Sequence, residues 1–429
     1  MGKNTLLSSL FQNISVQQLS KKLNNPRFWR NSGLLMLANV IVTLLGLIRT
    51  PAMTWILPKD DYGMIAAVSA WIPFLQLLSL SGLDNASYHY TAKGKPWAFV
   101  ITTKKRLIWS ISSSLCFIVL AIFWFIKNNS TLGWLFLVTG ISFPVTAGLS
   151  GVPGMISGQE KFYNLFWYRI LESLCDFVGF IPLAFSAWLG SRVVIFYTSN
   201  QIAAGIMQII FCYWIYTNLV KEKTPQLDRE DENELIRYGK HQTAISGISV
   251  VQSRVDAVLV SILLSPSIMA DYNIGLIIAD QFKRLWNIYI SIRYPPLVKM
   301  DLPRRRRRFV LEGTVIFVSF LVLGIFVSYL GHFLIPILLP PSYGTSLGYL
   351  DILIGTVIIG TPGGIIEMYY RSKQNEKMQY VMRITSAIVS VVASLVFILL
   401  WGGKGAAYGR LFSNLIFSLL GICLFYIRK

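Results

Sequence analysis

Several charged side chains lie inside long apolar stretches of the chain, where ionisable residues are rare. The basic ones that we expect to bind an anionic group are Arg49, Arg254, Lys283, Arg284 and Arg410. The acidic ones that we expect to balance this charge, or to bind a proton or coupling ion, are Asp256, Asp280, Glu172 and Asp176. A charge that faces lipid costs several kcal/mol, so most of these side chains must face other helices or a wet cavity. Arginine holds anions through paired donors, so the set predicts a basic cavity within a membrane.

The spacing of these residues indicates how helices would present them. In two groups, the residues are spaced three or four apart and therefore lie on one face of a helix. The groups are Arg169 with Glu172 and Asp176, and Asp280 with Lys283 and Arg284. Arg254 and Asp256 are two residues apart, so they point in different directions and we expect them to find different partners. The alternative to a binding cavity is a set of interhelical ion pairs that fix the packing, and Arg169 with Glu172 would be one example.

The elements that must position these residues are membrane-spanning helices. Hydrophobic residues make up 54% of the 429 residues and charged residues only 14%, against about 25% charged in a typical soluble protein. Runs of about 20 apolar residues recur along the chain, each long enough to cross a bilayer. We expect about twelve spans, at residues 32–57, 62–83, 106–127, 132–157, 163–188, 193–219, 238–264, 270–292, 308–330, 345–370, 379–400 and 404–427. This makes the chain an all-α integral membrane protein.

The positive charges predict its orientation. The formal net charge is +19, and about 29 of the 39 Lys and Arg residues lie at the two termini or in the connections on the same side. Such an asymmetry predicts a multi-pass protein of the plasma membrane whose two termini both lie on the cytoplasmic side. Because the basic residues sit in short connections between apolar runs, we expect membrane lipids as partners and no nucleic acid.

The sequence also indicates an internal duplication. Asp61-Tyr62-Gly63 after the first span matches Asp271-Tyr272-Asn273 after the seventh, and Ser199-Asn200 in the sixth matches Ser413-Asn414 in the twelfth. Two six-helix bundles related by a pseudo-two-fold axis along the membrane normal would explain these matches. The expected parts are an amphipathic N-terminal segment (1–30), a first bundle (31–220), a polar linker (221–235) and a second bundle (236–429).

No catalytic centre, metal site or cofactor site is expected. The four cysteines fall inside apolar runs without metal-ligand spacing, the three histidines are scattered, and the chain lacks a phosphate-cradling Gly-x4-Gly-Lys loop. The chain is therefore not expected to be an enzyme.

A resemblance to a known superfamily rests on two stretches. Residues Ser253 to Val260, followed by Ala270-Asp271-Tyr272-Asn273, resemble the seventh-span signature of the multidrug/oligosaccharidyl-lipid/polysaccharide (MOP) exporter superfamily. Leu57 to Gly63 resembles its first hinge. Across about residues 30–427 the chain is most similar to the O-antigen and capsule flippases. That resemblance implies alternating-access transfer of polyprenyl-diphosphate-linked oligosaccharide from the inner to the outer leaflet, alongside polysaccharide polymerase and glycosyltransferase partners.

One departure from the superfamily bears on the substrate. The first span lacks the acidic residue of the drug-exporting branch and carries Arg49 instead. This argues against a cationic drug and suits a diphosphate held by the basic residues. Three alternatives stay open: a small-molecule secondary exporter on the same fold, an integral-membrane glycosyltransferase or acyltransferase, and a scaffold role.

Overall fold

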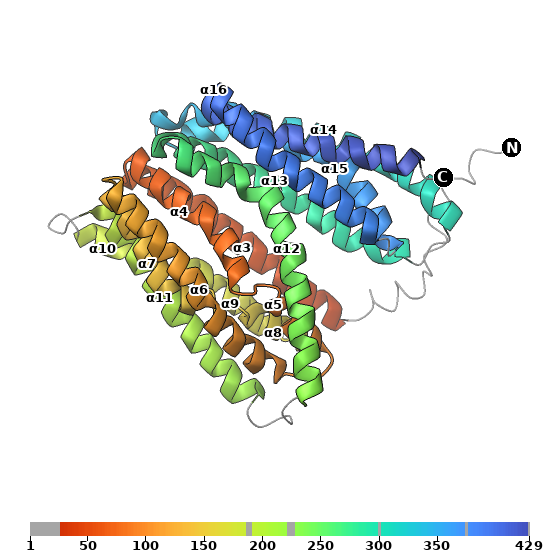
Figure 1. Cartoon of the computed structure of the whole chain (residues 1–429), viewed down its shortest axis with the longest axis horizontal. Coiled ribbons are helices and arrows are strands. Elements are labelled where there is room, and N and C mark those ends of the chain that lie inside the picture. The colour runs from red at the N-terminus through yellow and green to blue at the C-terminus, as the bar shows by residue number, and fades with distance from the viewer. Residues whose placement is uncertain (1–25, 186–190, 221–227, 299–301, 374–375, 428–429) are drawn as a thin grey trace.

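The computed structural model describes residues 26–185, 191–220, 228–298, 302–373 and 376–427, in which every regular element is a helix (Figure 1). Residues 1–25 of the amphipathic N-terminal segment expected at 1–30 lie outside the described residues. Eight of the described helices are long and apolar enough to cross a membrane. The chain is therefore a multi-pass, all-helical membrane protein.

The helices before residue 221 differ in length more than the sequence suggests. They are α3 (Pro26–Ile56), α4 (Lys59–Leu78), α5 (Leu83–Ala92), α6 (Ala98–Ile126), α7 (Ser130–Thr146), α8 (Val152–Gly158), α9 (Phe162–Cys175), α10 (Phe180–Phe185) and α11 (Arg192–Ile215), which ends in a π turn (Tyr216–Val220). The expected span 132–157 is broken between α7 and α8, and the expected span 163–188 is broken between α9 and α10. Both breaks fall in stretches rich in proline and glycine, which interrupt the backbone hydrogen bonding of a helix.

The helices after residue 227 are mostly long. They are α12 (Arg229–Leu263), α13 (Pro266–Val298), α14 (Leu302–Leu338), a 3₁₀ turn (Pro341–Tyr343), α15 (Ser346–Ser372) and α16 (Glu376–Ile427). Helix α16 consists of two helices joined at Gly402, whose φ of 59° and ψ of −135° are not helical. Glycine adopts this positive φ without the steric cost that a Cβ atom would impose, so the chain turns there between two helical segments.

Part of the expected polar linker (221–235) belongs to a helix. Helix α12 begins at Arg229, so residues 229–235 are helical. The reason is a packing contact, because Leu235 is fully buried in a cluster with Leu83 and Tyr90 of α5. Thr243 adds a hydrogen bond by accepting from the backbone N–H of Gly82 at 3.0 Å.

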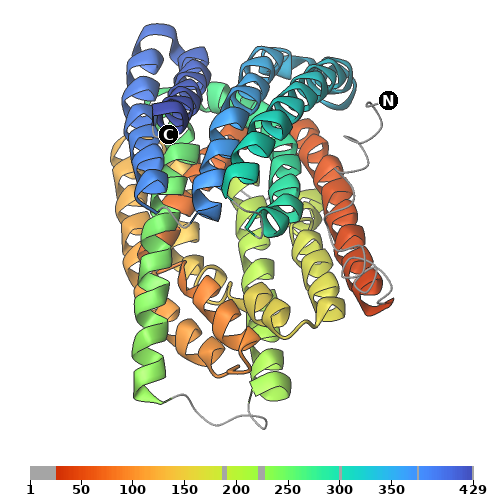
Figure 2. The ribbon, with the colours of Figure 1, turned by 90° about the vertical axis from the view of Figure 1, so that its right-hand side faces the viewer.

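Helix α12 consequently contacts both halves of the chain. Its first part lies beside α5, while its later part packs with α4 and with α16. In Figure 2 the lower part of α12, in green, extends past the blue helices and lies next to the orange helices of the first half. Helix α4 also runs along α13 (Figure 1), and they come so close that a Cβ on Gly63 would lie 1.8 Å from the carbonyl oxygen of Pro266.

Candidate functional site

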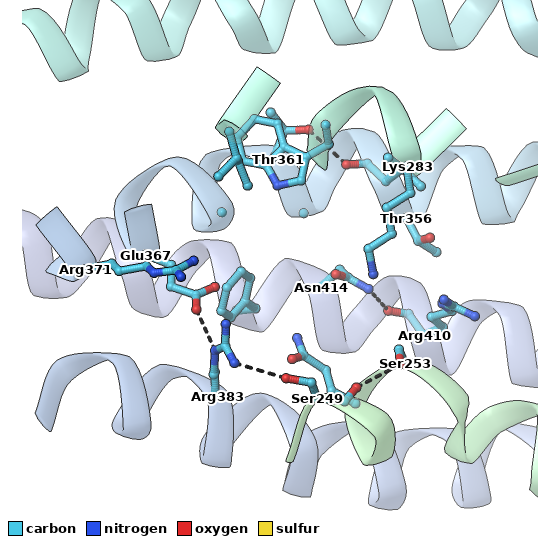
Figure 3. A pocket seen from close by; sticks show the side chains of 17 residues that line it. Ser249, Ser253, Lys283, Thr356, Thr361, Glu367, Arg371, Arg383, Arg410 and Asn414 are labelled. Carbon is cyan, nitrogen blue, oxygen red and sulfur yellow. Dashed lines mark hydrogen bonds and ion pairs between the residues drawn. The ribbon is translucent and has the colours of Figure 1, made fainter. Parts of the chain in front are cut away.

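A cavity of about 520 Å³ lies within the second half of the chain, lined by α12, α13, α15 and both segments of α16 (Figure 3). Its charged lining residues are Lys283, Arg371, Arg383, Arg410 and Glu367, and its amide and aromatic lining residues are Gln252, Asn414, Trp286 and Phe417. Serine and threonine hydroxyls complete the polar walls. Four basic groups against one acid make the lining strongly basic.

The charged groups gather toward two ends of the cavity. Figure 3 shows Lys283 and Arg410 toward one end, and Arg371, Arg383 and Glu367 toward the other. Arg383 is fixed there by its Nε, which donates to Glu367 Oε1 at 2.5 Å, and by its Nη1, which donates to Ser249 Oγ at 3.0 Å. Its charge is therefore already compensated by a carboxylate.

Arg410 is held by a buried network at the first end. Its Nη1 donates to Asp256 Oδ2 at 3.2 Å, and the hydroxyl of Tyr272 donates to the same oxygen. Arg410 is 6% exposed and Asp256 1% exposed, so this pair is buried deeply. The other carboxylate oxygen of Asp256 has no hydrogen-bond partner within the described residues.

Asp280 links a second arginine to this network. It accepts from Nη2 of Arg254 at 2.8 Å, and its other oxygen lies 3.9 Å from Nη2 of Arg410. Arg254 and Asp256 thus have different partners, as their two-residue spacing predicts. Two aspartates and two arginines balance each other in charge.

Lys283 differs from its basic neighbours. It lines the cavity, yet within the described part of the chain its ammonium forms no ion pair with a carboxylate, whereas Arg254, Arg383 and Arg410 each have one. A cation without a carboxylate partner at membrane depth favours an anionic ligand. This end of the cavity can therefore accept an anion without displacing an existing ion pair.

Of the other basic candidates, Arg284 and Arg49 are placed elsewhere. Arg284 is exposed and does not line the cavity, since one residue beyond Lys283 rotates a helical side chain by about 100°. Arg284 was expected in the binding cavity, but it is not among the residues that line this one. Arg49 lies in the first half, where its Nη1 donates to Asp176 Oδ2 at 2.9 Å.

The fifth-span group is only partly as expected. Glu172 accepts from the hydroxyl of Tyr168 at 3.3 Å, and Arg169 donates to Asn39 at 2.6 Å. The suggested Arg169–Glu172 ion pair is therefore absent from the described structure. Asp176 pairs with Arg49 instead, because α3 packs against α9.

Arg371 and Arg383 line the cavity but were not among the expected site residues, because Arg371 directly follows the expected span 345–370 and Arg383 lies near the start of the expected span 379–400. One signal could have revealed Arg383. Three fully buried serines, Ser386, Ser390 and Ser394, follow it at spacings of three and four residues. Such a row marks a buried polar helix face that begins at Arg383.

The two halves are joined at the end of the molecule where α4 and α13 begin. Lys59 Nζ lies 2.8 Å from Asp271 Oδ2 and donates to the carbonyl oxygen of Ser342 at 2.6 Å. Asn273 donates to the hydroxyl of Tyr62 at 3.0 Å. Lys283 lies twelve residues after Asp271 on α13, about 18 Å along the helix, so the cavity is remote from this junction.

Comparisons with known proteins identify a family model and several folds. The model of the family described as "Polysaccharide biosynthesis protein" matches residues 28–301. No match was found among curated proteins.

Three solved structures share the fold at 12–14% identity. An inward-facing multidrug resistance MATE family transporter of the MOP superfamily has a TM-score of 0.71 at 12% identity, covering 90% of this chain and 94% of its own. The lipid II flippase MurJ, in an inward closed conformation, has a TM-score of 0.61 at 13% identity, covering 92% and 87%. An outward-facing MATE family transporter has a TM-score of 0.54 at 14% identity, covering 94% and 95%.

Proposed function

The chain belongs to the polysaccharide biosynthesis protein family, and from this premise we propose that it is a flippase for polyprenyl-diphosphate-linked oligosaccharides. The substrate would move from the inner to the outer leaflet of the cell membrane, as an O-antigen or capsule repeat unit does. The observation that carries the proposal is the basic cavity lined by Lys283, whose ammonium forms no ion pair with a carboxylate of the described structure, whereas Arg254, Arg383 and Arg410 each have one. The lipid II flippase MurJ, named for another lipid-linked substrate, shares the fold.

The diphosphate would bind between Lys283 and Arg410. Asp256 and Tyr272 fix Arg410 from behind, and Asp280 fixes Arg254, so the guanidinium groups need little reorganisation when the anion arrives. Prearranged donors lower the ordering cost of binding. In the absence of substrate, Asp256 and Asp280 keep the arginines neutralised. The pair of Arg49 with Asp176, together with Glu172, would serve charge balance or ion coupling in the first half.

Transport would proceed by alternating access of two bundles. We assign twelve crossings in two six-helix bundles with a pseudo-two-fold axis along the membrane normal: α3, α4, α6, α7, α9 with α10, and α11 in the first, and α12, α13, α14, α15 and the two parts of α16 in the second. The bundles correspond to residues 31–220 and 236–429, with both termini cytoplasmic. The junction of Lys59 with Asp271 would then close the outer side.

Two observations support an inward-facing state. The fold agrees better with the inward-facing MATE family transporter than with the outward-facing one, at TM-scores of 0.71 and 0.54. The junction that ties α4 to α13 lies at the end remote from the cavity.

The membrane potential supplies a driving force for transport. An inside-negative potential favours outward movement of the diphosphate by about 2.3 kcal/mol per charge per 100 mV.

A small-molecule exporter is the second candidate on this fold. The basic lining of the cavity disfavours cationic drugs, because Lys283 would repel them. Export of a membrane-impermeant anionic dye that persists without any lipid-linked sugar would favour this candidate.

The test measures flipping of a polyprenyl-diphosphate oligosaccharide in proteoliposomes. Replacing Lys283 with Ala should slow flipping about tenfold or more, because a hydrogen bond to a charged group contributes about 1.5–3 kcal/mol. The matched control is Lys373→Ala, since Lys373 lies over the ring of Tyr369 at 4.3 Å and does not line the cavity. Unchanged flipping in Lys283→Ala at equal reconstitution would refute the proposed site.

A further inference from the structure

Trp286 lines the same cavity as Lys283 and lies one helical turn further along α13. Residues three apart on a helix lie on one face, with Cβ atoms about 5–6 Å apart. A group bound at the ammonium of Lys283 therefore has the indole of Trp286 as its next neighbour along the cavity wall.

The indole is held firmly in place. It stacks on the ring of Tyr289, with centroids 5.5 Å apart, and meets the ring of Phe320 edge-on at 5.7 Å. On α15, Gly364 allows the close approach, because a Cβ there would lie 2.8 Å from Cζ2 of the indole. A ring fixed in this way contributes contact area without losing further side-chain freedom when a ligand binds.

Two amides in the same cavity are also oriented by the protein. Nδ2 of Asn414 donates to the carbonyl oxygen of Arg410 at 2.9 Å, and Nε2 of Gln252 donates to Ser386 Oγ at 2.8 Å. Within the described residues, neither amide oxygen accepts a hydrogen bond from the protein. These oxygens can accept from hydroxyl groups of a ligand.

We infer that Trp286 is the platform on which the first sugar of the lipid-linked substrate rests, with Asn414 and Gln252 accepting hydrogen bonds from its hydroxyl groups. This inference rests on the proposed function. A sugar presents an apolar face of C–H groups and a rim of hydroxyls, which matches an aromatic ring beside amides. The first sugar is bonded directly to the diphosphate, so a diphosphate at Lys283 brings that sugar to the neighbouring turn of α13.

The test compares two kinds of probe on the purified full chain in detergent. One is polyprenyl diphosphate without sugar, and the other is a set of the same lipid bearing one N-acetylglucosamine, glucose or galactose. We expect at least one sugar-bearing probe to bind tighter than the bare diphosphate. Trp286→Leu should lower the affinity for that probe about tenfold, equivalent to about 1.4 kcal/mol, and leave the affinity for the bare diphosphate unchanged.

Additional variants separate folding from binding. Trp286→Phe keeps an aromatic ring and should retain part of the sugar-dependent affinity, which keeps the test valid if Trp286→Leu does not fold. Trp124→Leu, a half-buried tryptophan of α6, should leave both affinities unchanged. Equal losses for both probes, no loss in either Trp286 variant, or no sugar-bearing probe that binds tighter than the bare lipid would overturn the inference.

The same data distinguish failure of the inference from failure of the proposed function. Lys283→Gln should weaken binding of both probes. If neither probe binds in a Lys283-dependent way, the proposed function fails with its diphosphate site. If both depend on Lys283 but Trp286 has no sugar-specific effect, only the sugar platform is wrong.

Discussion

Lys59 of α4 places its ammonium 2.8 Å from a carboxylate oxygen of Asp271 at the start of α13, and so joins the first half of the chain to the second. The lysine is 18% exposed and the aspartate 7%, so solvent screens the pair only partly. The hydroxyl of Thr345 donates to the same carboxylate. Breaking such a pair leaves a buried charge without its counter-charge, which makes this contact a determinant of whether the two halves stay closed there.

The first prediction concerns opening at this junction. Lys59→Ala should shift the protein toward the state that is open where α4 and α13 begin, because Asp271 loses its cation. Ser346 is fully buried beside the junction, so Ser346→Cys in a chain with its native cysteines replaced by Ser reports this opening. We expect labelling by a membrane-impermeant maleimide to rise roughly tenfold, corresponding to about 1.4 kcal/mol.

A charge swap is the control for this prediction. The double variant Lys59→Asp with Asp271→Lys restores opposite charges and should return labelling toward the starting rate. Equal labelling rates with and without Lys59→Ala would show that the pair does not hold the junction closed.

The second prediction concerns the buried partner of Arg410. Asp256→Asn leaves the guanidinium of Arg410 buried without its nearest counter-charge and should destabilise the protein by about 3–5 kcal/mol. Adding Arg410→Met to this variant removes the uncompensated charge and should recover part of the loss. The thermal unfolding midpoint in detergent measures both effects, and a double variant no more stable than Asp256→Asn would contradict the argument.

How much of this site can be predicted from the sequence depends on how far apart in the chain the contacting residues lie. The two-residue spacing of Arg254 and Asp256 suffices to predict that they have different partners, because it fixes their directions on one helix. The sequence also places Lys283 and Arg284 on roughly one face with Asp280. The rotation of α13 against α15 determines whether Lys283 or Arg284 points into the cavity. Packing between helices that are far apart in the chain sets this rotation.

The spacing of charged residues along the chain does not predict which of them form ion pairs between helices. Arg49 finds Asp176 although 127 residues separate them, and Arg383 finds Glu367 on a neighbouring helix. Local periodicity predicts that each charge is turned inward, since lipid would penalise it. It does not specify the partner, because several inward-facing acids satisfy the same requirement.

The third prediction tests the close approach of α15 to Trp286. Gly364→Ala adds a Cβ that would lie 2.8 Å from the indole, so the ring must shift and the sugar-dependent part of substrate affinity should fall severalfold. Gly247→Ala is the matched control, because its nearest neighbour would be a side-chain carbon of Leu77 at 3.6 Å, an ordinary contact. Binding of the bare and sugar-bearing lipids measures the difference. Equal behaviour of the two alanine variants would mean that the position of the indole does not matter.

The fourth prediction concerns another contact between the halves, where α12 meets α5. Lys95 lies 2.5 Å from Asp231 there, but the lysine is 44% exposed, and exposed pairs contribute only about 0–1 kcal/mol. Leu235 is fully buried against α5, and truncating a buried leucine costs about 2–5 kcal/mol. Leu235→Ala should therefore lower the thermal unfolding midpoint clearly, whereas Lys95→Ala should barely change it. The reverse order would mean that charge, and not apolar packing, attaches α12 to the first half.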